Sequence, residues 1–155
     1  MLSYSAEIYK LTHEFYEICA SGKSELLQKE NRAYNCLLVD LHTNYFICIP
    51  YRTNMTHNFG YHFQSSKRCI HNKSGLDYTK MVIVSELSFL DSNVTIDFDE
   101  YKETITHLDR IVRGAIAYLD GYINHVKKIN LLPSARFERK YGKSTLVYFH
   151  KELGI

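Results

Sequence analysis

The sequence predicts an α+β protein in which one long helix crosses a small, mostly antiparallel sheet. Two observations predict the sheet. Residues 34–41 and 44–49 are short, apolar and aromatic segments two residues apart, and residues 81–84 are Met-Val-Ile-Val. A third observation predicts the helix, since apolar residues recur at helical spacing from 97 to 126. With 155 residues, 45% of them apolar, the chain is expected to form one domain over residues 1–155.

The N-terminal part is expected to begin with a helix and to continue with a β-hairpin. Apolar residues in 5–20 follow helical spacing, and Gly22 would end that helix. Residues 34–41 and 44–49 are expected to form the two strands of the hairpin. Pro50 is expected to end the second strand, because proline has no N–H to donate to a ladder.

The middle of the chain, residues 51–79, is polar and shows little apolar periodicity. We expect one short strand within it, at either 61–63 or 68–70. The apolar run at 81–84 is short and rich in β-branched residues, which favours a buried strand.

The long helix is expected to begin at Asp97, which can form a capping box with Glu100 three residues later. Gly114 and Gly121 lie two turns apart on this helix and lower its intrinsic stability. We therefore expect them where the helix packs closely against a strand or another helix. The core face is expected to consist of Ile105, Leu108, Val112, Ala115, Leu119, Tyr122 and Val126.

The C-terminal part of the chain is basic. Pro133 stops the long helix, residues 134–141 are expected to form a short basic helix, and residues 145–149 a last strand. Net charge is only +2, yet residues 110–155 hold nine Lys or Arg against three acids, and residues 32–80 hold six against two. These two basic segments could frame a binding site for a polyanion, and the alternative is an ordinary mixed surface.

Several classes of protein lack support in the sequence. A GxxxxGK[ST] loop, an HExxH motif, a clustered set of Asp and Glu, and a GxSxG motif are all missing. This argues against a P-loop hydrolase, a two-metal nuclease and the usual α/β-hydrolase. No apolar run reaches the ~18 residues of a membrane span, and no export signal is visible. We expect a cytoplasmic protein with four reduced thiols, without membrane contact, metal or cofactor.

Residues 51–79 carry the candidate chemistry, because they are dense in Arg, Lys, His, Ser and Tyr and hold a single acid, Asp77. Such a segment suits phosphate groups. It favours cleavage of RNA by its own 2′-hydroxyl, a reaction that needs a base, an acid and donors for the charge of the phosphorane. The candidate catalytic residues are His57 as general base or acid, Thr53 to position the phosphate, Arg52 and Lys67 to stabilise its charge, and Ser65.

Each of these residues also has a simpler interpretation. A histidine in a polar loop, such as His57, is commonly a surface residue. Residues 65–68 are Ser-Ser-Lys-Arg, which is also typical of a solvated turn. Arg32, taken alone, is an exposed charge.

Four stretches in this order resemble a known family. They are NRAYNCLLVDL at 31–41, YFICIPYRT at 45–53, LDYTKMVIV at 76–84, and the helical segment 101–126. The chain resembles the toxins of type III toxin–antitoxin systems, the ToxN/AbiQ-like endoribonucleases, and most closely their CptN-like branch. The resemblance covers most of residues 31–126.

The resemblance implies a compact, barrel-like sheet related to the MazF/Kid toxins. It also implies sequence-selective, metal-independent cleavage of single-stranded cellular or phage RNA that leaves a 2′,3′-cyclic phosphate, as in abortive infection. The inhibitor would be a small, repeat-derived, pseudoknotted RNA antitoxin. The toxin would process this RNA and bind it in a basic groove, forming an RNA–protein hetero-oligomer.

Three positions follow from this resemblance. Thr53 falls where the family has an active-site hydroxyl after the proline, and Arg32 falls where it has a lysine before the first strand. Met55 stands in place of a family lysine. The missing cation would then come from Arg52, Lys67 or His57. The family also begins with a strand, whereas the spacing in 5–20 predicts a helix.

The residues expected to bind RNA lie in three parts of the chain. The basic segment from 127 to 143 is expected to follow the backbone of the antitoxin RNA, away from the chemistry. The full set is Arg32, Tyr51, Arg68, Lys127, Lys128, Arg136, Arg139, Lys140 and Lys143. Two other functions stay open: a non-catalytic RNA-binding module, and an interaction protein whose basic patches meet an acidic partner.

Overall fold

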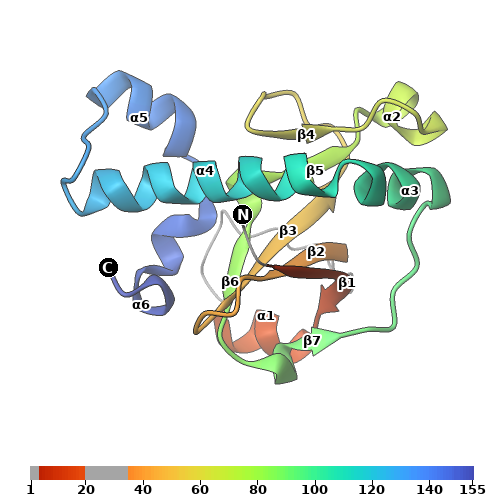
Figure 1. Ribbon diagram of the computed structural model, residues 1–155, viewed down its shortest axis with the longest axis horizontal. Helices are drawn as coiled ribbons and strands as arrows, with labels where there is room; N and C mark the ends of the chain where they lie inside the picture. The colour runs from red at the N-terminus through yellow and green to blue at the C-terminus, as the bar shows by residue number, and fades with distance from the viewer. Residues whose placement is uncertain (1–3, 20–34) are drawn as a thin grey trace.

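The computed structural model describes residues 4–19 and 35–155, and these form an α+β structure (Figure 1). The strands are β1 (Ser5–Leu11), β2 (Asn35–Asp40), β3 (Phe46–Arg52), β4 (Gly60–His62), β5 (Gly75–Asp77), β6 (Val82–Val84) and β7 (Leu90–Asp91). The α-helices are α1 (His13–Cys19), α2 (Lys67–Asn72), α3 (Phe98–Thr106), α4 (Leu108–Val126), α5 (Ser134–Tyr141) and α6 (His150–Leu153). Short 3₁₀ turns are η1 (Tyr78–Lys80), η2 (Leu87–Phe89) and η3 (Thr145–Tyr148).

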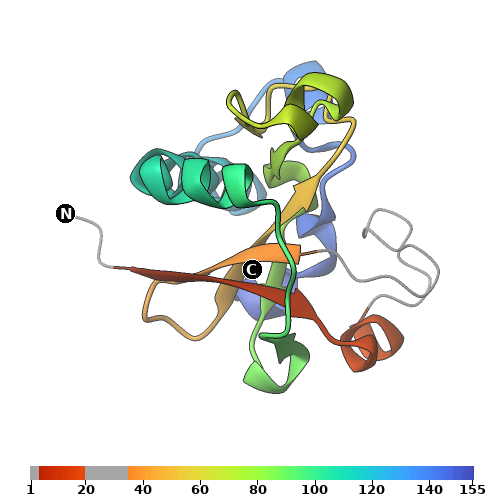
Figure 2. The ribbon, with the colours of Figure 1, turned by 90° about the vertical axis from the view of Figure 1, so that its right-hand side faces the viewer.

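The seven strands form one antiparallel sheet in the order β4-β5-β3-β2-β1-β7, and β6 also pairs with β3. Among the described strands, the two at the ends of this order, β4 and β7, do not pair with each other. The sheet is therefore open and does not close into the expected barrel. Figure 2 shows β1 and β2 side by side, and Figure 1 shows α4 running across the strands.

Strand β3 organises the sheet because it changes partner along one edge. Its first half, Phe46–Cys48, pairs with β6, and its last two residues pair with β5. Pro50 falls between these two partners and lies opposite Cys36 of β2. The prediction that Pro50 ends the strand is therefore wrong. The missing N–H is tolerated where the ladder on that edge is interrupted.

The first element is also different from the prediction. Residues 5–11 form β1, which pairs with β2 from Ser5↔Asp40 to Lys10↔Asn35, and the helix α1 comes only at 13–19. The apolar residues of this segment fit both periods, and pairing with two neighbouring strands decides for the strand. The hairpin predicted at 34–41 and 44–49 is confirmed, because β2 and β3 pair with each other. Tyr34, the first residue of the predicted hairpin, lies outside the described residues.

The predicted long helix is divided in two at His107, which separates α3 from α4. Asp97 caps α3 by accepting a hydrogen bond of 3.0 Å from the backbone N–H of Glu100. The buried face of α4 includes Val112, Ala115, Leu119 and Tyr122, as expected, together with Ile111 and Tyr118. Ile105, in contrast, is exposed.

Other elements agree with the sequence more closely. The strand β4 lies at 60–62, so the choice of 61–63 is the better one, while 68–70 belongs to α2. The buried strand at 82–84 and the basic helix α5 are confirmed. The last predicted strand, 145–149, is instead the 3₁₀ turn η3 and the residue after it. In the described ranges no helix is both long enough and apolar enough to cross a membrane.

Candidate functional site

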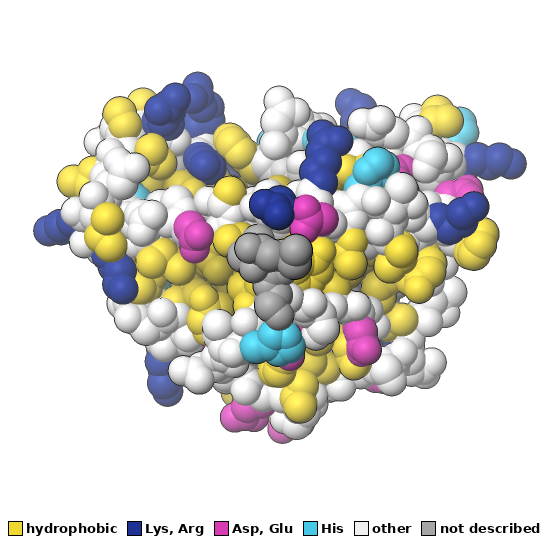
Figure 3. All heavy atoms as spheres, viewed as in Figure 1, with side chains coloured by type: hydrophobic (Ala, Val, Ile, Leu, Met, Phe, Trp, Pro, Cys, Tyr) yellow, Lys and Arg dark blue, Asp and Glu magenta, His cyan; other side chains and the backbone are white. Residues whose placement is uncertain are grey.

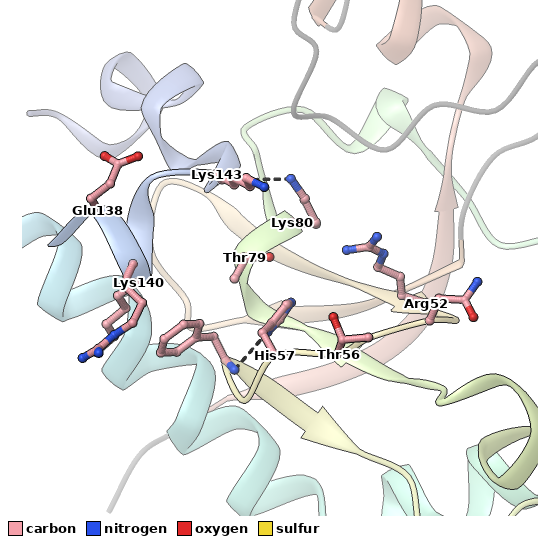
Figure 4. A pocket seen from close by; sticks show the side chains of 11 residues that line it. Arg52, Thr56, His57, Thr79, Lys80, Glu138, Lys140 and Lys143 are labelled. Carbon is pink, nitrogen blue, oxygen red and sulfur yellow. Dashed lines mark hydrogen bonds between the residues drawn. The ribbon is translucent and has the colours of Figure 1, made fainter. Parts of the chain in front are cut away.

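A cavity of about 510 Å³ lies between α5, the loop after β3 and the turn η1 (Figure 4). Its charged side chains are mainly cations, and Glu138 is the acid among the described residues that line it. Figure 4 shows Arg52 entering from β3, His57 from the loop, and Lys140 and Lys143 from the side of α5. The lining residues are Arg52, Asn54, Thr56, His57, Phe59, Thr79, Lys80, Glu138, Arg139, Lys140 and Lys143.

The carboxylate of Asp77 lies beneath this cavity and is completely buried. It contacts residues from β3, from the loop after β3 and from the turn η1. Its Oδ2 accepts a 2.7 Å hydrogen bond from Arg52 Nη1 and lies 3.2 Å from His57 Nε2. Its Oδ1 accepts hydrogen bonds from the backbone N–H and the hydroxyl of Thr79. A buried carboxylate is stable only with such donors, so Asp77 fixes the positions of the groups around it.

Both ring nitrogens of His57 have partners. Nδ1 accepts a hydrogen bond of 3.0 Å from the backbone N–H of Phe59. Nε2 faces the carboxylate of Asp77, which can only accept, so Nε2 carries the proton and the ring is neutral in this arrangement. The imidazole is therefore held in one tautomer and one orientation at the wall of the cavity.

The turn η1 is anchored to α4 by Tyr78. Its hydroxyl donates a 2.9 Å hydrogen bond to the carbonyl of Ile111, and the ring lies against Gly114, where a side chain would collide with it. Burial raises the pKa of Tyr78 to about 12, so the phenol keeps its proton. This anchor positions Lys80, whose Nζ donates to the carbonyl of Lys143 across the cavity.

The loop that carries His57 is shaped by a buried methionine. Met55 is 1% exposed and packs against Gly60 and Gly75, where its side chain occupies the space that two Cβ atoms would need. Asn54 adopts a left-handed conformation (φ 57°), and its N–H bonds to the carbonyl of Asn72. Because residue 55 points into the core, a lysine there would not reach the cavity without rearrangement of the loop.

No known protein family, curated protein or solved structure matches the chain.

The structure brings together some of the predicted catalytic residues and separates others. His57 and Arg52 line the cavity, whereas Thr53 is half-buried beside it and is not among the lining residues. Lys67 is exposed at the start of α2 and is not among the residues that line the cavity. The hydroxyl of Ser65 donates to the carboxylate of Glu103 at 2.6 Å and thus has a structural partner.

The predicted RNA-binding residues divide in the same way. Arg139, Lys140 and Lys143 line the cavity itself, so this part of the basic segment lies next to His57 and not away from it. Figure 3 shows Lys and Arg side chains gathered over α5. Arg136 lies on the same helix, and Lys127 and Lys128 are exposed at the end of α4.

Three further predicted residues have other surroundings. Tyr51 is buried, and its hydroxyl lies 2.8 Å from the hydroxyl of Thr104. Arg68 is 3.8 Å from the buried carboxylate of Glu100. Arg32 lies outside the described residues.

Sequence reasoning does not identify Asp77, Phe59 or Lys80 as members of the site. The lining residues that it also leaves out are Asn54, Thr56, Thr79 and Glu138. In the sequence Asp77 is the one acid of the polar segment, and its isolation among cations is the signal that could identify it. Lys80 and Phe59 gave no signal, because their role depends on the chain folding back between β4 and β6. Among the described residues, no three His, Cys, Asp or Glu side chains gather in a way that could hold a metal ion.

Proposed function

We propose that the protein is a metal-independent endoribonuclease that cleaves single-stranded RNA through attack of its 2′-hydroxyl, leaving a 2′,3′-cyclic phosphate. One observation carries this proposal: five Lys and Arg side chains and the His57–Asp77 pair surround one cavity. Cations at this density favour a phosphodiester, and the imidazole is the group beside them that can move a proton near neutral pH.

In the proposed reaction the 2′-oxygen forms a bond to phosphorus while the bond from phosphorus to the 5′-oxygen breaks. The proton of the 2′-hydroxyl passes to a base, and the departing 5′-oxygen takes up a proton. Arg52 and Lys143, on opposite sides of the cavity, would stabilise the additional negative charge on the phosphorane.

His57 can act as the base or the acid only through Nδ1, since Nε2–H donates to Asp77. Nδ1 must first release the N–H of Phe59, which requires a small movement of the loop at 57–59. Asp77 would then stabilise the imidazolium that forms, as a buried carboxylate beside a histidine does in other enzymes.

The biological part of the proposal comes from the sequence resemblance. The protein would be the toxin of a type III system, with a sheet distantly related to that of the MazF/Kid toxins. A small, repeat-derived RNA would be its substrate and its inhibitor. A tandem array of short repeats directly upstream of the gene would support this assignment.

The experiment is cleavage of a labelled single-stranded RNA by purified protein in excess EDTA, with analysis of the product ends. We expect specific fragments with 2′,3′-cyclic phosphate ends, and a loss of roughly 10²-fold in rate for His57→Gln. His71→Gln is the matched control, because His71 is exposed on α2. Equal rates for both variants would overturn the role of His57 and leave the nuclease.

A second candidate is a non-catalytic RNA-binding module. It is favoured by the two hydrogen bonds that occupy both nitrogens of His57. Tight RNA binding without cleavage, by protein confirmed to be free of antitoxin, would decide for this module.

A further inference from the structure

A second cavity of about 340 Å³ adjoins the first one along α5. Both cavities are lined by Phe59, Arg139 and Lys140, so these three residues form the wall between them. Leu132 and Arg136 complete the lining of the second cavity. Because Arg136 and Lys140 are four residues apart on α5, their side chains lie on one side of the helix.

The second cavity has the composition of a site for a nucleotide base. Phe59 and Leu132 give it an apolar part, and each charged residue among its described lining is a cation. Proteins that hold single-stranded nucleic acid combine these two features: an aromatic ring on which a base stacks and cations for the adjacent phosphates. A metabolite anion would need the cations but not the aromatic ring.

Phe59 is fixed in place by its backbone before any ligand binds. Its N–H donates to His57 Nδ1, and its carbonyl accepts a 3.1 Å hydrogen bond from the N–H of Tyr78. Its ring stacks on the imidazole of His57, with centroids 5.9 Å apart and planes at 25°. A base stacked on Phe59 would therefore belong to a nucleotide next to the bond that His57 acts on.

We infer that the second cavity binds the base of the nucleotide adjacent to the cleaved bond, with Phe59 as its stacking partner and Arg136 on its phosphate. This inference rests on the proposed function. It specifies that the substrate is recognised over at least two consecutive nucleotides, one in each cavity.

The test is a scan of binding affinity with modified RNA. The probe is a labelled single-stranded RNA with a 2′-deoxynucleotide at the cleaved position, so that binding is measured without reaction. One abasic site is then moved along the RNA, position by position. Wild-type protein is compared with Phe59→Leu, and with Phe98→Leu as the matched control, since Phe98 is an exposed aromatic residue on α3.

We expect an abasic site at one neighbour of the cleaved bond to weaken wild-type binding roughly tenfold. Phe59→Leu should bind the intact RNA about as weakly as wild-type protein binds the RNA with that abasic site. The abasic site should not weaken the binding of Phe59→Leu any further. Phe98→Leu should behave as wild type. A scan without any sensitive neighbour, or the same tenfold penalty in Phe59→Leu, would overturn the inference.

Arg136→Gln provides a second variant, and because the side chain of Arg136 is exposed, the substitution should not disturb the core. It should weaken binding of the intact RNA and leave unchanged the binding of an RNA shortened by the sensitive nucleotide. An equal effect on both RNAs contradicts the inference. The proposed function fails separately, by the absence of cleavage. In that event the scan is repeated with unmodified RNA, where a flat profile again overturns the base site.

Discussion

His57 donates from Nε2 to the buried carboxylate of Asp77 over 3.2 Å, and the same carboxylate holds Arg52 at 2.7 Å. One acid thus positions both a group that can move a proton and a group that can bind phosphate. Arg52 ends β3 and His57 lies in the loop after it, whereas Asp77 ends the short strand β5, 25 and 20 residues further along the chain.

Replacing Asp77 with asparagine should lower both the rate of RNA cleavage and the stability of the protein. We expect RNA cleavage to fall roughly 10²-fold, because the imidazole loses the acceptor that fixes its tautomer and stabilises its charged form. We also expect the free energy of unfolding to drop by about 2 kcal/mol, since hydrogen bonds to a charged group are lost. Cleavage kinetics and urea denaturation measure the two changes.

The control for this variant is Asp91→Asn, which removes a carboxylate that pairs with Lys10 near the surface. It should leave the rate of RNA cleavage unchanged and alter the free energy of unfolding by no more than a few tenths of a kcal/mol. Wild-type cleavage by a folded Asp77→Asn protein would contradict the role given to this acid.

The lysines of the cavity should differ from the other lysines in the salt dependence of RNA binding. Each cation that contacts a phosphate of a single strand adds about 0.7 to the slope of log affinity against log salt. Lys140→Gln and Lys143→Gln should therefore each reduce this slope by about 0.7. Lys67→Gln, at the start of α2, should leave the slope unchanged, and an equal reduction there would place the RNA differently.

Glu103 should stabilise the protein in a way that depends on pH. Burial acts to raise the pKa of this carboxyl, and hydrogen bonds from Ser65, Gln64 and Tyr61 outweigh it, so the pKa lies below its ordinary value of 4.5. A lowered pKa in the folded state means that the stabilisation is complete above pH 4.5 and is lost as the pH falls through the lowered value.

Glu103→Gln should therefore reduce the free energy of unfolding by about 2 kcal/mol at pH 7. The difference from wild type should shrink below pH 4.5. Urea denaturation across this range, with the exposed Glu86→Gln as control, measures it. A difference that stays constant into acid would show that shape, and not charge, explains the loss.

Gly114→Ala should destabilise the protein although alanine favours helices. An added Cβ would lie 2.5 Å from the hydroxyl oxygen of Tyr78, and this crowding costs about 1–3 kcal/mol. The gain in helix propensity is about 1 kcal/mol. We expect a net loss of up to about 2 kcal/mol, partly relieved in the double variant with Tyr78→Phe. A more stable Gly114→Ala protein would contradict the close contact.

Much of the fold follows from local sequence patterns, and the errors lie where distant segments decide. The hairpin, the strand at 82–84 and the helix 134–141 carry their own signals of period and turn residues. The strand β1 does not, because its apolar residues also fit a helix and only β2 and β7 settle its form. The break between α3 and α4 at His107 has no sequence signal, because no proline or glycine lies there.

The site was predicted in part for the same reason. His57 and Arg52 were found because residue types alone suggest phosphate chemistry. Asp77 was passed over, since an acid in a basic segment acquires its meaning only when the chain brings it beneath both partners. Met55 shows the converse, because its buried position could not be told from its place in a polar segment.

The order of the site's segments along the chain bears on when the proposed activity would arise during synthesis. The loop with His57 and the turn η1 are made before β6, β7 and α4. Arg139, Lys140 and Lys143, which line the other side of the cavity, are made some sixty residues after η1, beyond the whole of α4. A nascent chain that still lacks α5 and the residues after it contains His57 but lacks three of the five cations that line the cavity. Under the proposed function, the ribosome that makes this protein would meet the completed site only after α5 has emerged and folded.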